Sequence, residues 1–241
     1  MKYTTTKDIE QIYALAQENG FSLIPLFELG GWNMVMLLGK LGIPRTARIT
    51  IVCSSERKGG FGLATAHHLL NHRWNVNVVL AQTDLSPQAT YFLEIIKKIG
   101  APVVSYQEEH SAAQRLIHSS QVVIDALLGT DAAKTRNATV NTLIALLSQS
   151  ERKIISFDLP SGLDGSTGLS FPPVLRAYAT LALAMPSQAF LSKEGPHLCG
   201  QVFMADIGLP KFIYDKISMG SRPKFDMHEN AIMPFKDYLL D

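Results

Sequence analysis

From residue 48 onward, short apolar runs alternate with longer segments in which apolar residues recur at helical spacing. Runs such as 49–53, 76–80 and 122–127 are apolar at nearly every position, which is typical of strands buried on both faces. Strands that alternate with helices in this way pair in parallel and are covered by helices on both faces. The sequence therefore predicts an α/β fold on a mostly parallel central sheet.

The remaining boundaries come from turn and capping residues. Two helices precede the alternation: Thr5 and Asp8 form a capping pair for the first, which Gly20 ends, and Pro25 suits the first turn of the second. The segment from Ser54 to Gly62 is predicted as a polar, glycine-bearing loop. The other predicted strands are 102–105, 154–157, 180–184 and 201–205, and the other predicted helices are 63–71, 86–98, 108–118 and 139–148. The tail from about residue 220 has no periodicity and is predicted to be a loosely packed extension.

Composition narrows the class of protein. The chain has 241 residues, of which 46% are hydrophobic, and this is enough for one large domain with a sizeable core. A net charge of +1 gives no argument for binding nucleic acid or an anionic membrane. Two cysteines, Cys53 and Cys199, make no disulfide framework, and the N-terminus lacks the apolar run of a signal peptide. We expect a cytoplasmic protein.

The stretch 153–165 carries the first candidate functional residue. Asp158 falls at the C-terminal end of a predicted strand, and Pro160 stops that strand because proline cannot donate a ladder hydrogen bond. Ser161-Gly162 then forms a turn pair. Open α/β sheets bind ligands at this edge, so Asp158 is a ligand-binding candidate. The alternative is that Asp158 only caps its turn.

Three loops should meet at this edge, because the strands are parallel. They follow Cys53, Leu127 and Phe157, and they bring Asp125 close to Asp158. Two carboxylates on neighbouring strand ends can divide the roles of acid and base, or can bind a cation together. The alternative is that each accepts hydrogen bonds from the next loop.

Other candidate patterns are weaker. The segment 54–62 matches neither the Rossmann nor the Walker glycine pattern, so phosphate binding and a plain tight turn both remain open. His68 and His72 have the spacing of metal ligands on a helix, but without an accompanying glutamate we interpret them as surface or core residues. Ser161 lacks the Gly-x-Ser-x-Gly context of a hydrolase nucleophile.

Four motifs resemble those of a known family. Residues 158–164 resemble its Asp-Ile-Pro-Ser-Gly-x-Asp, residues 125–130 its Asp-Ala-Ile-Phe-Gly-Thr, and residues 205–210 its Ala-Asp-Ile-Gly-Ile-Pro. Residues 27–31 are a degraded form of its Met-Glu-Asn-Ala-Gly. The family is the YjeF N-terminal domain, also known as NAD(P)H-hydrate epimerase or apolipoprotein A-I-binding protein. The resemblance covers about residues 3–215.

The resemblance implies a fold, an activity and partners. The fold is a three-layer α/β/α, Rossmann-like single domain spanning residues 1–241, with 220–241 as a C-terminal extension, and it is commonly a homodimer. The activity is the interconversion of the R and S hydrates of NADH and NADPH at C6, which serves a partner dehydratase. Asp158 takes the position of the catalytic acid. The implied substrate-binding positions are Arg57, Lys58, Gly59, Gly60, Phe61, Gly129, Thr130, Asp131 and Asp158.

The resemblance also implies a potassium site, at Lys58, Asp125 and Ser161. The family has asparagine where this chain has Lys58, and a lysine side chain has only donors. Either the Lys58 ammonium replaces the ion beside Asp125 and Ser161, or Lys58 points to solvent and the site has decayed. The family aspartate at position 61 is here Phe61, which would stack on a base or cover the pocket.

These departures leave several functions open. Asp131 adds a negative charge that disfavours a diphosphate unless Lys134 or Arg136 offsets it. The chain is therefore either an active epimerase, or a degenerate member that acts as a nucleotide-binding or dimerising regulatory module. A third possibility is an enzyme that acts on another nucleotide or a phosphosugar.

Overall fold

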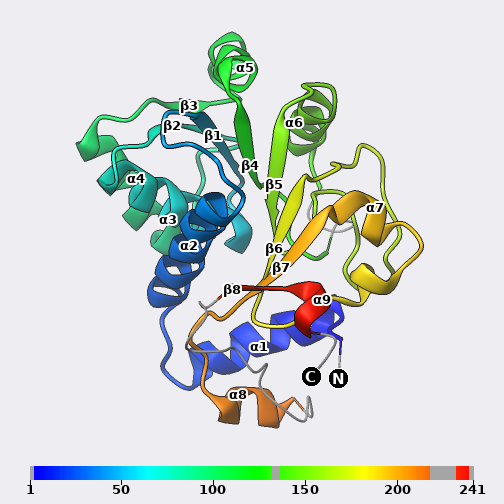
Figure 1. Ribbon diagram of the computed structural model, residues 1–241. Coiled ribbons are helices and arrows are strands. Elements are labelled where there is room, and N and C mark those ends of the chain that lie inside the picture. Colours follow the sequence, from blue (N-terminus) through cyan, green and yellow to red (C-terminus); the bar gives the residue numbers. More distant parts are fainter. Residues whose placement is uncertain (1–2, 132–135, 218–231, 239–241) are drawn as a thin grey trace.

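A central sheet of eight strands organises the molecule (Figure 1), in the order β3-β2-β1-β4-β5-β6-β7-β8. The computed structural model describes residues 3–131, 136–217 and 232–238. All neighbouring strands pair in parallel except β7 and β8, so the prediction of a mostly parallel sheet is confirmed. The strands are β1 Arg48–Cys53, β2 Asn75–Leu80, β3 Val103–Ser105, β4 Val122–Ala126, β5 Lys153–Phe157, β6 Ala179–Leu183, β7 Gln201–Ala205 and β8 Ile232–Pro234.

Helices cover both faces of the sheet, which gives the expected three-layer α/β/α arrangement. The chain order reverses between β1 and β4, and this is where doubly wound sheets open a crevice at their carboxyl edge. The helices are α1 Thr6–Glu18, α2 Leu23–Lys40, α3 Arg57–Asn71, α4 Pro87–Ile99, α5 His110–Ser119, α6 Ala138–Ser148, α7 Gly195–Cys199, α8 Lys211–Lys216 and α9 Phe235–Tyr238, with a 3₁₀ turn η1 at Gln188–Leu191.

The core is divided by the sheet into two sides. Helices α1 to α4 pack on one side, where alternate strand residues such as Ile51, Ile124 and Phe157 point. The intervening residues, such as Val52 and Val123, point to the other side and pack against α5 and α6. This alternation follows from the period of two along a strand, and it explains why these strands are apolar at nearly every position.

Capping residues fix most helix boundaries where the sequence predicts them. The Thr5 hydroxyl accepts from the Asp8 backbone N–H while the Asp8 carboxylate accepts from the Thr5 N–H, which completes a capping box at the start of α1. Ser86 caps α4, and Gly100 ends it with a left-handed φ of 85°. These local signals do not depend on tertiary contacts, so the sequence alone locates these ends.

The start of α3 differs from the prediction. The helix begins at Arg57, so the segment predicted as a loop up to Gly62 forms its first turns. The prediction was wrong because three glycines lower the helix propensity of this segment, whereas packing decides its structure. A Cβ on Gly59 would lie 1.9 Å from the Ser54 carbonyl oxygen, so only glycine lets the helix start so close to β1.

The C-terminal segment forms an edge strand in part. Ile232–Pro234 pairs antiparallel with β7, and Ile232 is buried. The predicted loose extension is therefore wrong for this strand, whose three residues are too few for a periodic signal. Residues 235–238 of the predicted extension form the short helix α9, and residues 220–231 and 239–241 lie outside the described residues.

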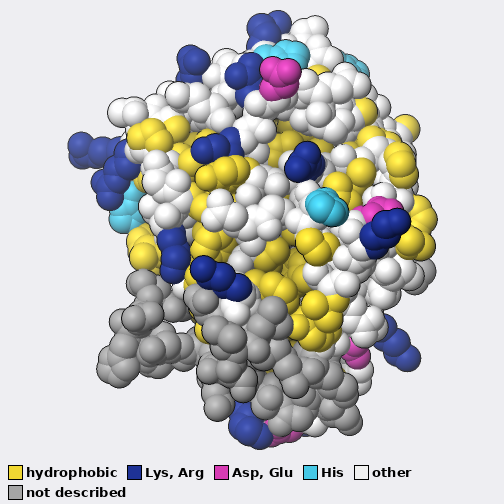
Figure 2. Space-filling model, turned by 45° about the vertical axis from the view of Figure 1, so that its right-hand side comes forward, with side chains coloured by type: hydrophobic (Ala, Val, Ile, Leu, Met, Phe, Trp, Pro, Cys, Tyr) yellow, Lys and Arg dark blue, Asp and Glu magenta, His cyan; other side chains and the backbone are white. Residues whose placement is uncertain are grey.

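On the described part of the face drawn in Figure 2, basic side chains are scattered among hydrophobic and uncharged ones. Both Cys53 and Cys199 are buried and free. Among the described residues, no helix has the length and apolar character that crossing a bilayer requires.

Helix α1 lies across the carboxyl edge of the sheet (Figure 1). The Thr4 N–H donates to the Pro186 carbonyl at 2.8 Å, and the Thr6 hydroxyl donates to the Thr130 carbonyl at 2.8 Å. These contacts tie the start of α1 to the loops that follow β4 and β6. The helix therefore covers the edge where the candidate site lies.

Candidate functional site

The loops after β1, β4 and β5 converge, as predicted, around the Lys58 ammonium. Lys58 enters from the first turn of α3, and its Nζ lies 2.9 Å from Asp125 Oδ2, 2.8 Å from the Leu159 carbonyl oxygen and 3.2 Å from Ser161 Oγ. Its side chain is 1% exposed and that of Asp125 is 0% exposed. The alternative in which Lys58 points to solvent is therefore wrong.

The Asp125 carboxylate is the main acceptor of this cluster. Its Oδ2 accepts from Lys58 Nζ, from the Ser156 hydroxyl at 2.9 Å and from the Ser161 N–H at 3.0 Å. Its Oδ1 accepts from the Leu127 N–H at 3.1 Å and from the Ser161 hydroxyl at 2.6 Å. Five donors from the protein occupy this carboxylate, so Asp125 is held in place and is not available to a bound substrate.

Asp158 has a different environment from Asp125. It has a left-handed φ of 54°, and an i to i+2 hydrogen bond from the Leu159 N–H to the Phe157 carbonyl closes a tight turn around it. Its Oδ1 accepts from the Leu183 N–H at 3.1 Å. Burial raises the pKa of the Asp158 carboxyl, although that hydrogen bond and the nearby Arg57 guanidinium oppose the shift.

A small cavity borders Asp158. Its volume is about 10 Å³, and Thr4, Ile9 and Thr130 also line it. The Thr130 hydroxyl is buried and has no hydrogen-bond partner among the described residues. The space is polar on the side of Thr130 and Asp158, but Thr4 and Ile9 at the start of α1 close it.

Two much larger cavities lie away from this edge. One of about 600 Å³ lies beside α2 and is lined by Trp32, Met36 and Trp74 among others. A second, of about 570 Å³, lies at the β7 edge between Phe190 and Phe235. Neither borders Asp158, so size alone would point away from the residues that the motifs single out.

Arg57 links the rim of the site to α1. Its guanidinium lies 3.9 Å above the Tyr13 ring and 3.0 Å from the Glu10 carboxylate. Because Glu10 is exposed, its ion pair with Arg57 is weak. Stacking of the Arg57 guanidinium on the buried Tyr13 ring stabilises the contact further. Arg57 therefore holds α1 in place and lies near Asp158.

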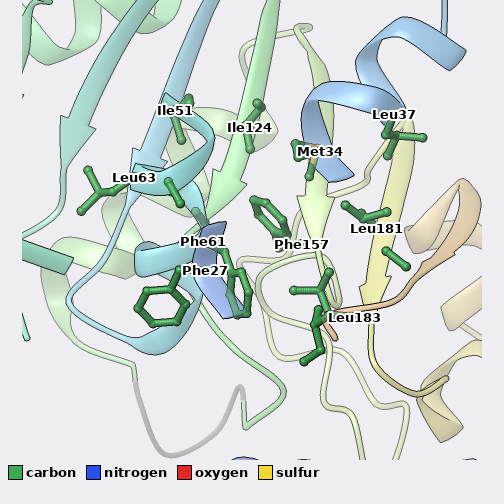
Figure 3. Packing of buried hydrophobic residues seen from close by; sticks show 14 of the residues in the cluster. Phe27, Met34, Leu37, Ile51, Phe61, Leu63, Ile124, Phe157, Leu181 and Leu183 are labelled. Atoms are coloured by element: carbon green, nitrogen blue, oxygen red, sulfur yellow. The ribbon is translucent and has the colours of Figure 1, made fainter. Parts of the chain in front are cut away.

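Phe61 occupies the core rather than a pocket. Its ring is fully buried and packs against Phe27 at 4.9 Å and Phe157 at 5.7 Å between centroids (Figure 3). A ring with no exposed surface offers no face to a base, so neither expectation for Phe61, stacking or covering a pocket, fits its position. The sequence could not show this, because the residues that surround Phe61 come from three other elements.

The neighbouring glycines serve packing. A Cβ on Gly60 would lie 2.3 Å from the Phe27 ring, and the N–H groups of Gly59 and Gly60 both point to the Glu56 carbonyl, at 2.9 and 3.4 Å. Amides that are already bonded within the chain are not presented to a phosphate. The contacts therefore favour the tight-turn interpretation of this segment over a phosphate cradle.

The loop after β4 is described only in part. A Cβ on Gly129 would meet nothing within 4 Å, so this glycine is not required by packing. Arg136 donates to Asn141 at 2.7 Å and to the Pro173 carbonyl at 2.8 Å, and therefore links the loop after β4 to α6 and to the segment after β5. Lys134 lies outside the described residues.

His68 and His72, which have the spacing of metal ligands but are interpreted as surface or core residues, contact different groups. His72 packs on the Trp32 ring at 5.3 Å, whereas His68 Nε2 lies 2.6 Å from a Glu28 carboxylate oxygen. His67, next in the chain, brings its Nδ1 to 3.8 Å from the same carboxylate. Glu28 was missed because it lies on α2, far from the histidines in sequence.

The fold and the site together define a class: an open, doubly wound α/β domain whose candidate residues lie at the carboxyl edge next to the switch in strand order. Comparison with known families goes further. The model of the family described as YjeF-related protein N-terminus matches residues 24–189, and the chain belongs to this family.

Relatives and a solved structure agree with this assignment. The chain is 31% identical over 218 residues to a bifunctional NAD(P)H-hydrate repair enzyme of Moorella thermoacetica, a match that covers 88% of the chain but only 41% of that enzyme. It is 30% identical over 206 residues to an NAD(P)H-hydrate epimerase of Dehalogenimonas lykanthroporepellens, covering 84% and 80% respectively. The crystal structure of the yeast protein ynu0 has the same fold, with a TM-score of 0.82, 17% identity, and coverage of 97% of this chain and 100% of that one.

Proposed function

We propose that the protein is an NAD(P)H-hydrate epimerase, which interconverts the R and S hydrates of NADH and NADPH. The observation that carries this proposal is the position of Asp158, which lines the same cavity as Thr130, whose buried hydroxyl has no hydrogen-bond partner in the described part of the chain. Both residues lie in the motifs that the chain shares with the family. A relative named as an epimerase, aligned over 80% of its length, supports the same activity.

The chemistry follows from the raised pKa of Asp158. A carboxyl that keeps its proton to higher pH can donate it to the C6 hydroxyl of the hydrate, which then leaves as water. The lone pair of the adjacent ring nitrogen stabilises the resulting cation. Water then adds to either face of C6, and Asp158 takes back the proton, so the carboxyl is regenerated and only the configuration changes.

Substrate entry requires α1 to move. The cavity of about 10 Å³ is far below the roughly 300–1,000 Å³ of pockets that hold small molecules. Thr6 and Glu10 fasten α1 through one hydrogen bond to the Thr130 carbonyl and one exposed ion pair to Arg57. These two contacts contribute about 1 kcal/mol each, but Ile9, Ile12 and Tyr13 of α1 are also buried in the core, so the binding energy of the dinucleotide has to offset the loss of their packing.

The test measures the rate at which R-NADHX is converted to its S epimer, with chromatography to separate the two epimers. We expect the protein to accelerate the reaction over the spontaneous rate, and Asp158→Asn to lose about 10²- to 10⁴-fold, which is the usual contribution of a general acid. Asparagine tolerates the left-handed backbone, so this variant changes the chemistry and not the turn. Asp215→Asn, which affects only an exposed pair with Lys211, is the matched control.

A degenerate, non-catalytic module is the second candidate, and the closed cavity favours it. In that case R-NADHX is not epimerised faster than in buffer, which removes the first proposal. A melting temperature that rises with NADH or NADHX would then identify a nucleotide-binding module, by the ordinary linkage of binding to stability.

We propose two partners on the basis of the relatives. The relative from Moorella thermoacetica is named as a bifunctional NAD(P)H-hydrate repair enzyme, and this chain matches 41% of it, so a dehydratase is the proposed functional partner. A homodimer is the second proposal. Helix α2 packs on α3 and leaves Trp32 and Met36 partly exposed, at 36% and 39%. Light scattering of the purified chain tests this proposal.

A further inference from the structure

We infer that the Lys58 ammonium is the permanent cation of the buried cage formed by Asp125, Leu159 and Ser161, and that this protein does not take up potassium there. The inference rests on the geometry of the cage and stands independently of the proposed epimerase activity. It makes Lys58 a positioning residue.

The donors and acceptors of the cage match one for one. A lysine ammonium has three N–H donors, and three oxygens lie at hydrogen-bond distance from Nζ: Asp125 Oδ2 at 2.9 Å, the Leu159 carbonyl at 2.8 Å and Ser161 Oγ at 3.2 Å. The Ser161 hydroxyl gives its single proton to Asp125 Oδ1 and accepts from the Leu128 N–H at 2.9 Å. This arrangement leaves no polar atom of the cage without a partner.

The charges also balance. Asp125 is an anion in a site with no exposed surface, and Lys58 is the cation in direct contact with it. A charge buried without a partner is very costly, whereas a pair with further hydrogen bonds is tolerated. The Ser156 hydroxyl and the Leu127 and Ser161 N–H groups supply those bonds to Asp125.

The potassium ion that the family resemblance implies does not fit these residues. Potassium needs oxygen ligands, and Lys58 replaces the asparagine carbonyl with a group that can only donate. The three remaining oxygens already point to the ammonium, so an ion would have to displace it and would meet a second positive charge. The cage therefore excludes potassium for two reasons: Lys58 offers no oxygen ligand, and its ammonium already occupies the position of the ion.

The tethered cation joins three segments at the point where the site lies. Lys58 lies in the first turn of α3, Asp125 lies next to the last residue of β4, and Leu159 and Ser161 follow β5. The Leu159 carbonyl belongs to the residue next to Asp158, so the ammonium fixes the turn that presents the candidate acid. Loss of Lys58 should therefore disturb the positions of these loops rather than remove a group that touches the substrate.

The first arm of the test measures the melting temperature of the unmodified chain in potassium, sodium and tetramethylammonium chloride at equal ionic strength. We expect the same melting temperature in all three salts. A melting temperature that rises with potassium concentration and not with the other two would overturn the inference. This measurement needs no substrate, so its outcome is separate from that of the epimerase assay.

The second arm compares Lys58→Asn with Lys58→Met. Lys58→Asn removes the ammonium and puts a carbonyl oxygen in the cage. The melting temperature of this variant should therefore rise with potassium concentration and not with tetramethylammonium concentration. Methionine returns neither charge nor oxygen, so Lys58→Met should melt about 6–20 °C lower than the unmodified chain in every salt.

A double variant protects the test against simple misfolding. Lys58→Met with Asp125→Asn removes both charges and should recover a large part of the lost melting temperature, because no buried anion is left unpaired. If Lys58→Met melts like the unmodified chain, or if Lys58→Asn shows no response to potassium, the Lys58 ammonium is not the cation of this site.

Discussion

Gly30 and Phe61 are predicted to be energetically coupled. A Cβ on Gly30 would lie 2.4 Å from Cδ1 and 2.5 Å from Cε1 of the Phe61 ring. Carbon atoms in contact are normally about 3.5–4.0 Å apart, so Gly30→Ala requires a movement of more than about 1 Å. Phe27 and Phe157 surround the ring, and it has little room to move away.

The size of the effect follows from two opposing terms. Alanine in place of glycine inside a helix stabilises by about 1 kcal/mol, whereas forcing extra volume into a packed core costs about 1–3 kcal/mol. Because two ring atoms are too close, we take the upper part of this range and expect Gly30→Ala to destabilise the fold by about 2 kcal/mol. With Phe61→Ala as background both clashing ring atoms are absent, and the same change should stabilise by about 1 kcal/mol.

Urea unfolding of the unmodified chain, the two single variants and the double variant completes a double-mutant cycle, from which we expect a coupling energy of about 3 kcal/mol. Gly39→Ala in the same helix is the matched control, because a Cβ there meets nothing within 4 Å, and it should stabilise by roughly 0.5–1 kcal/mol. If Gly30→Ala stabilises as much as Gly39→Ala does, or if its effect is the same with and without Phe61, the steric reasoning is refuted.

Three further predictions concern the candidate site. Gly59→Ala, whose Cβ would lie 1.9 Å from the Ser54 carbonyl oxygen, should lower the free energy of unfolding in urea by about 3 kcal/mol. Gly129→Ala, whose Cβ meets nothing within 4 Å, should change it by no more than about 0.5 kcal/mol. Equal effects would contradict the role given to Gly59. The raised pKa of Asp158 means that folding disfavours its charged form, so the unmodified chain should lose stability relative to Asp158→Asn as pH rises from the ordinary pKa of 3.8 through the raised pKa of the folded state. Thermal melts from pH 4 to pH 7 check this. A difference in melting temperature that does not change with pH would rule out the burial argument. Thr5→Ala removes the capping box of α1 and should lower the free energy of unfolding, measured by calorimetry, by about 1 kcal/mol. Amide hydrogen exchange should become faster in α1 alone. An even increase in exchange over the whole chain would contradict the idea that α1 opens by itself.

The sequence predicts the sheet and its helices because their signals are local. A capping serine, a glycine at a helix end or a strand that is apolar at each position acts through its neighbours in the chain. The parallel sheet then places the ends of β1, β4 and β5 together, so the meeting of Lys58, Asp125 and Ser161 could also be predicted.

Features decided by contacts between distant segments could not be predicted in this way. The start of α3 and the burial of Phe61 depend on α2 and on β5, which are far away in sequence. The same holds for the division of roles between the two acids. Asp125 is neutralised by Lys58, whereas Asp158 borders a cavity that α1 closes, and no pattern in the chain distinguishes these environments.

The lysine cage also has a consequence for how the fold depends on its surroundings. A metal ion held by mass action leaves when its concentration falls below the dissociation constant, and the stability of the protein falls with it. A charge carried on a side chain has no such threshold, so dilution or dialysis cannot strip it from the site. Its costs are the desolvation of the ammonium and the rotamer entropy of one lysine, about 2 kcal/mol, and both are incurred once, during folding.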